Sequence, residues 1–202
     1  MLDIYKYSKK NWLFNFLFSK ILRININDLS KEFFYKKNIE LNFKESFFYD
    51  YCENNKVTKW SGSYSIDKLY QSNHDLEKLD NLKEPIRKLE KLLNDNVKNR
   101  IFKKDCIGKF KIKSLWFVIQ KNSGNSVEMH NHPKSALSGV YYFKVDKNSG
   151  GELNLHFENK KTEFIPEIKD LIVFNSNIFH SVNSYHGKND RIAVAWDAIY
   201  TF

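Results

Sequence analysis

The chain has 202 residues, a formal net charge of +9, 42% hydrophobic and 16% aromatic residues, and only 7 Gly and 3 Pro. This composition excludes collagen-like, low-complexity and fully disordered chains, because 17 Phe, 11 Tyr and 4 Trp provide enough apolar surface to offset the entropy of ordering. The length suits one compact domain with a substantial core.

The whole positive surplus lies in the first 115 residues. A basic region of this kind could bind nucleic acid by neutralising phosphates. The basic residues are nearly all Lys, however, and Asn and Ile are also abundant, which indicates a compositional bias spread over solvated surfaces. Nucleic acid is therefore a conceivable partner but not the favoured one.

The two cysteines, Cys52 and Cys106, form no C-x-x-C motif and are too few for a disulfide framework. We therefore expect two buried thiols in a reducing cytosol. Residues 12–18 imitate the apolar part of a signal peptide, but Asn15 interrupts them and no small-residue cleavage site follows. No apolar run reaches the roughly 18 residues that span a bilayer.

In chain order, the first predicted elements are helices. Apolar residues recur at helical spacing over 11–22 and again over 75–99, where Pro85 kinks the helix or starts a new one. These apolar faces are expected to cover a sheet. We expect an α-rich N-terminal region, 1–106, that packs on a strand-rich core, 107–202.

Short β-rich segments follow, separated by turns rich in Asn, Ser, Gly and Lys. The predicted strands are 109–120, 137–145, 152–157, 170–175, 179–183 and 191–200. Many short strands at this spacing favour an antiparallel sandwich or barrel over a parallel sheet. No G-x-G-x-x-G or P-loop motif occurs, which argues against the common nucleotide-binding folds.

The clearest chemical motif is His130-Asn131-His132. Residues i and i+2 of an extended segment point to the same side, so both imidazoles can reach one metal ion. As an isolated motif, however, H-x-H also occurs by chance.

Several later features strengthen the metal hypothesis. A buried strand, 136–145, is followed by Gly150-Gly151 and by the apolar segment 170–174, which leads to His180, and Arg191 comes eleven residues later. In order and spacing, residues 116–200 resemble the double-stranded β-helix (jelly-roll, cupin-like) core of the iron- and 2-oxoglutarate-dependent oxygenases, which include the prolyl hydroxylases. The signature H-x-H-P-x-S-x-L-S-G-V-Y-Y of a bacterial and phage subgroup runs from His130 to Tyr142 without interruption.

The resemblance implies specific roles. The family's H-x-[DE]…H metal motif falls on His130, position 132 and His180, its 2-oxoglutarate-binding Arg falls on Arg191, and a further contact to that carboxylate falls on Tyr142. The implied cofactors are Fe(II) and 2-oxoglutarate, with dioxygen as the other cosubstrate. The departure is His132, which stands where most relatives have a carboxylate; three imidazoles still form a competent ligand face, with one negative charge fewer.

Physical chemistry supports these assignments and leaves alternatives open. Three ligands on one face leave room for a bidentate 2-oxo acid and dioxygen, and a guanidinium suits the far carboxylate because it forms a planar, bidentate pair. Arg191 could instead form a salt bridge with Asp190 or Asp197, and Tyr142 could be a core aromatic residue.

Other candidates have simpler interpretations. The expected roles are core residues for Trp116 and Trp196, an outer-face residue for His156, a solvated loop residue for His186, a helix start for His74, and, less favoured than His132, an alternative ligand for Glu128.

The sequence as a whole predicts a non-haem Fe(II)- and 2-oxoglutarate-dependent dioxygenase of the hydroxylase type, with an unassigned substrate. One alternative is a cupin-like three-histidine metalloenzyme that does not use 2-oxoglutarate, and Arg191 argues against it. The other is a non-enzymatic jelly-roll binding module with structural histidines.

Overall fold

The fold consists of two antiparallel β-sheets that face each other. The computed structural model describes residues 33–55, 69–102, 107–121 and 126–201. The strand order is β1-β8-β5-β10-β3-β2 in the six-stranded sheet and β4-β9-β6-β7 in the four-stranded sheet. The strands are β1 (Phe34–Asn38), β2 (Leu69–Gln71), β3 (Lys109–Gln120), β4 (Val127–His130), β5 (Leu137–Lys144), β6 (Leu153–His156), β7 (Lys161–Phe164), β8 (Asp170–Asn175), β9 (Phe179–Val182) and β10 (Arg191–Thr201). All ladders between them are antiparallel, as predicted.

All six predicted strands are present, each within one residue of its predicted ends. The strands that were not predicted, β1, β2, β4 and β7, are the outermost strands of the two sheets. Edge strands of this chain bury few side chains: β1 buries only Tyr35, and β4 buries none fully. β2 is only three residues long, and β1, β4 and β7 each bury at most one side chain, so these strands lack the apolar alternation that a sequence pattern depends on.

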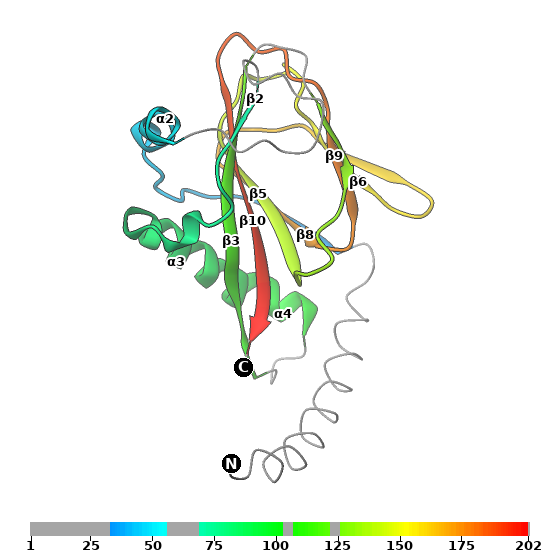
Figure 1. Cartoon of the computed structure of the whole chain (residues 1–202). Coiled ribbons are helices and arrows are strands. Elements are labelled where there is room, and N and C mark those ends of the chain that lie inside the picture. The colour runs from blue at the N-terminus through cyan, green and yellow to red at the C-terminus, as the bar shows by residue number, and fades with distance from the viewer. Residues whose placement is uncertain (1–32, 56–68, 103–106, 122–125, 202) are drawn as a thin grey trace, which may run out of the picture.

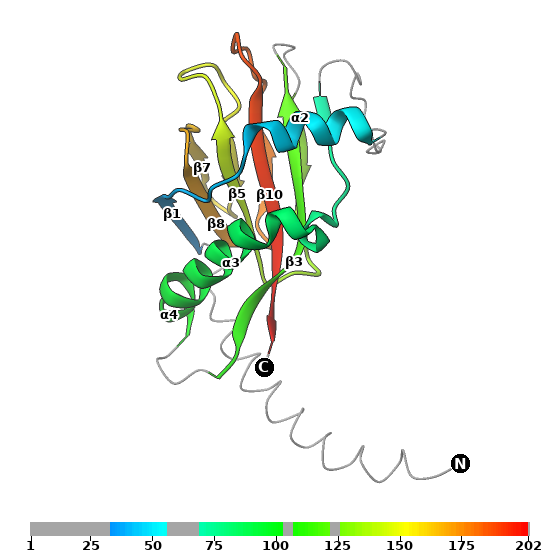
Figure 2. The same ribbon diagram turned by 90° about the vertical axis from the view of Figure 1, so that its left-hand side faces the viewer.

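Helices cover the outer face of the six-stranded sheet, as the views from the side and from the front show (Figures 1 and 2). They are α2 (Glu45–Asn54), the 3-10 turns η1 (Leu76–Lys78) and η2 (Asp80–Leu82), α3 (Lys83–Leu92), the π-helical turn η3 (Leu93–Val97) and α4 (Lys98–Ile101). The predicted helix over 75–99 therefore begins as two 3-10 turns. Pro85 lies in the first turn of α3, where its missing N–H costs no hydrogen bond, so this proline marks the start of a helix.

Two hydrophobic cores lie on either side of the six-stranded sheet. The larger packs the helices onto the sheet and includes Phe48 of α2, Leu89 of α3 and Phe117 of β3. The smaller lies between the two sheets and includes Tyr142 of β5 and Phe174 of β8. Several residues of this second core also line the cavity of the candidate site.

The N-terminal half contributes strands as well as helices, since β1 and β2 extend the six-stranded sheet at its two edges. The division at residue 106 stays a prediction. The predicted helix over 11–22 and Cys106 lie outside the described residues. Cys52 is a free thiol that packs half-buried against the larger core, where burial raises its pKa to about 11. None of the helices within the described ranges combines the length and apolar character needed to cross a bilayer.

Candidate metal centre

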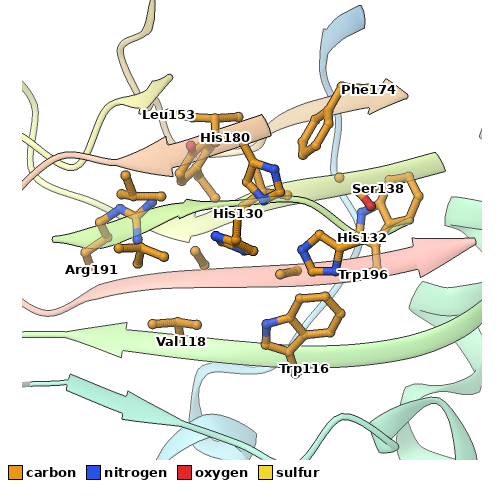
Figure 3. Close-up of a pocket in the computed structure, with 17 residues that line it drawn as sticks. Trp116, Val118, His130, His132, Ser138, Leu153, Phe174, His180, Arg191 and Trp196 are labelled. Atoms are coloured by element: carbon orange, nitrogen blue, oxygen red, sulfur yellow. The ribbon is translucent and has the colours of Figure 1, made fainter. Parts of the chain in front are cut away.

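Three histidines meet between the sheets. His130 ends β4, His132 follows it by two residues, and His180 lies on β9 directly opposite His130 in the ladder. Their potential ligand nitrogens all lie within 4.8 Å of one another, and the ring centroids of His130 and His180 are 4.3 Å apart. Figure 3 shows the three rings converging on one end of a cavity. The structure thus brings together the three residues that the sequence pattern singled out.

Hydrogen bonds orient all three rings in the same way. In each ring, Nδ1 lies within hydrogen-bond distance of an oxygen. The distance from Nδ1 is 2.8 Å to Glu128 O for His130, 3.2 Å to Ile178 O for His180, and 3.1 Å to Asp197 Oδ2 for His132. A carbonyl or carboxylate oxygen only accepts, so Nδ1 carries the proton in each bond and Nε2 keeps its lone pair. Three Nε2 lone pairs on one side of a cavity are the donor set that a divalent transition metal prefers.

The environment of His130 and His180 favours their neutral forms. Burial, together with the neighbouring His130, lowers the pKa of His180 to about 3. Burial also lowers the pKa of His130. Neutral imidazoles bind metal ions and protonated ones do not, so these residues fit a metal ion at neutral pH.

Arg191 lies at the other end of the same cavity (Figure 3). It begins β10 opposite Gln120 of β3, and its Nη1 donates to Gln120 Oε1 at 2.5 Å. Its guanidinium carbon lies 5.1 Å from the centre of the Tyr142 ring. Arg191 is only 2% exposed, and burial lowers its pKa.

No carboxylate among the described residues forms an ion pair with Arg191. Asp190 accepts a hydrogen bond from Tyr49 instead, and Asp197 accepts from His132 and Ser138, so the two salt bridges considered from the sequence are not formed. Arg191 Nε and Tyr142 Oη are also buried without a hydrogen-bond partner within the described part of the chain. A buried guanidinium without a counter-anion, beside a buried hydroxyl, fits an anionic ligand.

The space around the guanidinium depends on a glycine. Gly151 has φ +76°, and a Cβ atom there would lie 2.8 Å from Arg191 Nε. Any other residue would therefore strain the backbone and push the guanidinium aside.

Between the two ends, the cavity wall is mostly apolar. It includes Val118, Val140, Leu153, Phe174, Val182, Ala193 and Ala195. Trp116 and Trp196 are buried, as expected of core residues, and they also line the cavity. The Trp116 ring stacks with those of His132 and His74, at centroid distances of 5.7 Å and 4.3 Å. An apolar wall of this kind keeps water away from the histidines.

The remaining candidates lie elsewhere. His186 is exposed in its loop, as predicted, and His156 bonds to Ser181 Oγ at 2.9 Å outside the cavity. The side chain of Glu128 is exposed, and the carbonyl of this residue contacts His130 Nδ1.

Sequence reasoning missed Gln120 and Ser138 and treated Asp197 only as a salt-bridge candidate. Strand alternation was the available signal, because Arg191, Ala193, Ala195 and Asp197 follow one another at period two on β10.

Comparisons with known proteins agree with this geometry. Residues 114–165 match the family described as "Putative 2OG-Fe(II) oxygenase". This segment contains His130, His132 and Tyr142, while His180 and Arg191 lie beyond it. The sequence match and the fold agree: the matched segment is similar to 2OG-Fe(II) oxygenases, and solved structures of that class share the fold. No curated protein matches the chain by sequence.

Solved structures with the same fold include three prolyl hydroxylases. A Pseudomonas putida prolyl-4-hydroxylase has 13% identity, coverage of 88% of this chain and 98% of that one, and a TM-score of 0.59. A Trichoplax adhaerens prolyl hydroxylase in complex with a hypoxia-inducible-factor peptide has 15% identity, coverage of 91% and 92%, and a TM-score of 0.58. The viral collagen prolyl hydroxylase of Paramecium Bursaria Chlorella virus-1, in complex with 2OG, has 15% identity, coverage of 85% and 98%, and a TM-score of 0.56. The double-stranded β-helix predicted from the sequence is thereby confirmed.

Proposed function

We propose that the chain is an Fe(II)- and 2-oxoglutarate-dependent dioxygenase of the hydroxylase type, in which His130, His132 and His180 hold the iron. The observation that carries this proposal is the pairing, in one cavity, of three Nε2 lone pairs with a buried guanidinium that lacks an anion. A metal chelator with a distant carboxylate, such as 2-oxoglutarate, would satisfy both ends at once.

Each protein group has a defined task in this proposal. Arg191 binds the far carboxylate of 2-oxoglutarate through its guanidinium, and the Tyr142 hydroxyl donates to the same group. Gln120 holds the guanidinium in place through its contact with Nη1. The apolar wall excludes water from the space beside the histidines. When bound, Fe(II) would couple the conversion of 2-oxoglutarate and dioxygen into succinate and carbon dioxide to oxidation of a substrate C–H bond.

The choice of substrates to test depends on the similar structures and on the variable parts of the fold. Prolyl peptides are the first substrates to test, because the similar structures are named as prolyl hydroxylases. Specificity in a shared fold depends on loops and added segments, so small metabolites belong in the same panel. The three-histidine enzyme that binds substrate directly and uses no 2-oxo acid is disfavoured, since it leaves Arg191 buried without an anion.

The test is reconstitution with Fe(II) under anaerobic conditions, followed by titration with 2-oxoglutarate. We expect a visible metal-to-ligand charge-transfer band that saturates with 2-oxoglutarate, and succinate formation once air is admitted. Iron binding with neither the band nor succinate would contradict the use of 2-oxoglutarate and favour the three-histidine alternative.

A further inference from the structure

The three-histidine cluster supplies no negative charge to a bound metal ion. All three candidate iron ligands are neutral imidazoles, whereas the related motif has a carboxylate at position 132. An Fe(II) ion held by three neutral groups keeps its full double charge, and an Fe(III) ion keeps a triple charge. Any compensating negative charge from the protein must therefore come from a residue behind the ligands.

Asp197 occupies that place. Its Oδ2 accepts the Nδ1–H of His132 at 3.1 Å, and its Oδ1 accepts the hydroxyl of Ser138 at 2.6 Å. The side chain is 12% exposed. Within the described ranges, its only ion-pair contact is His132, so no Lys or Arg neutralises the carboxylate.

Strand pairing places the carboxylate behind the ring. Asp197 of β10 is the direct cross-strand partner of Ser138 on β5, which brings the hydroxyl to the carboxylate. On its other side, β10 pairs Asp197 with Ser114 and Ala198 with Ile112, so a bulge follows Asp197. Bulges redirect side chains at the ends of regular pairing, and this one lies beside the site.

The three histidines differ in the group that accepts their Nδ1–H. His130 and His180 donate their Nδ1–H to neutral backbone carbonyls, those of Glu128 and Ile178. Within the described residues, the Nδ1–H of His132 is the one of these three that meets an ionisable carboxylate. A hydrogen bond to an anion makes an imidazole a stronger donor at its other nitrogen, and such partners also fix the ring orientation.

We propose that Asp197 is a positioning residue for the iron face and supplies, through His132, the negative charge that a carboxylate at position 132 supplies in the related motif. This inference rests on the proposed function. Ser138 has the supporting task of fixing the carboxylate, because it occupies the oxygen that does not face His132.

The direct test is Asp197→Asn, which keeps the shape and removes the charge. We expect Fe(II) affinity, measured by anaerobic titration, to fall about 10- to 100-fold, as is typical when the partner of a ligand is lost. The Fe(III)/Fe(II) midpoint potential should rise, since the more highly charged state loses more stabilisation. A matched control is Asp170→Asn: Asp170 is also buried, pairs with Lys36 at 2.6 Å and lies outside the cavity wall. It should change neither quantity.

The Asp197→Asn substitution in a His132→Asp variant distinguishes an effect of the Asp197 charge from a purely structural role. In His132→Asp the carboxylate is itself a ligand, and Asp197 faces a like charge instead of an N–H group. Asp197→Asn should therefore weaken Fe(II) binding in the wild-type background and preserve or strengthen it in the His132→Asp background. A purely structural role of Asp197 predicts a loss in both backgrounds, which would overturn the inference.

Two controls distinguish a failure of this inference from a failure of the proposed function. Unchanged affinity and potential in Asp197→Asn, while His130→Ala loses iron, would refute this inference and leave the proposed function intact. Retention of iron in both His130→Ala and His180→Ala would instead refute the proposed function. If Asp197→Asn does not fold, Ser138→Ala replaces it: a smaller loss of affinity with a raised potential supports the inference, and wild-type values overturn it.

Discussion

The two ends of the cavity are built from different parts of the sheets. Arg191 and Tyr142 lie on β10 and β5, which are central strands of the six-stranded sheet, and both are fully enclosed. The histidines come from the edge strand β4, the segment after it, and the neighbouring strand β9 of the smaller sheet. The guanidinium is thus positioned by the core, whereas the histidines depend on hydrogen bonds to particular oxygens.

This difference indicates that the two ends of the cavity bind different groups. Burial without an anion makes the Arg191 end complementary to a carboxylate before any ligand arrives, because the guanidinium cannot move to solvent. The histidine end is more accessible: His130 and His132 are only partly buried, so an ion and a substrate can reach it. Substitutions at the two ends should therefore separate iron binding from 2-oxoglutarate binding.

The largest effect is expected at the histidine end. His130→Ala and His180→Ala should each lower Fe(II) affinity by more than about 100-fold, beyond the loss typical of residues that only support a ligand. The melting temperature without metal should change little for His130, which is only partly buried. Anaerobic dialysis with elemental analysis gives the iron content. Undiminished iron content in His180→Ala would contradict the ligand assignment.

The next effect concerns the arginine end. Arg191→Ala should weaken 2-oxoglutarate binding about 30- to several-thousand-fold, because truncating one partner of a buried charge pair typically costs about 2–5 kcal/mol. Arg191→Lys should also weaken it, since an ammonium cannot form the bidentate pair. Iron content should stay at the wild-type level in both variants. A charge-transfer titration that gives an unchanged dissociation constant for Arg191→Ala would show that the two ends are not linked by this ligand.

A smaller effect is expected from Gly151→Ala. The new Cβ would lie 2.8 Å from Arg191 Nε, so the guanidinium must shift, and we expect 2-oxoglutarate affinity to fall about tenfold, the equivalent of about 1.4 kcal/mol. Gly150→Ala is the matched control, because its φ is also positive but its Cβ would contact the backbone of Ser184. Both variants should lose stability, and only Gly151→Ala should change the titration. Equal affinities in the two variants would argue against a role of Gly151 in the carboxylate end.

The smallest expected effect concerns the basic N-terminal half and neither end of the cavity. Nucleic-acid binding by the basic N-terminal half should be weak and lost by about 0.2 M salt, as for sequence-independent phosphate contacts. Fluorescence anisotropy with labelled single- and double-stranded oligonucleotides measures this binding. Tight, sequence-selective binding at that salt concentration would make a nucleic acid the leading substrate candidate.

The sequence by itself determined the inner part of the fold and the site residues that lie on it. The predicted strands are the ones with neighbours on both sides in their sheet, and their burial leaves a clear apolar pattern. The H-x-H motif and the spacing to His180 and Arg191 identified the residues that the structure brings to one cavity. Helix α2 was not predicted, because its aromatic residues do not form a clean apolar stripe: only Phe48 is fully buried.

Only the tertiary structure decided which groups lack partners and which residues stand behind the ligands. That neither Asp190 nor Asp197 pairs with Arg191 follows from their hydrogen bonds with other residues, which a one-dimensional pattern does not contain. The contact between Asp197 and His132 joins residues 65 positions apart, and the contact of the same carboxylate with Ser138 depends on the register of β10 against β5. Register is set by the packing of a whole sheet, because a slip of one residue would turn every side chain of the strand to the opposite face.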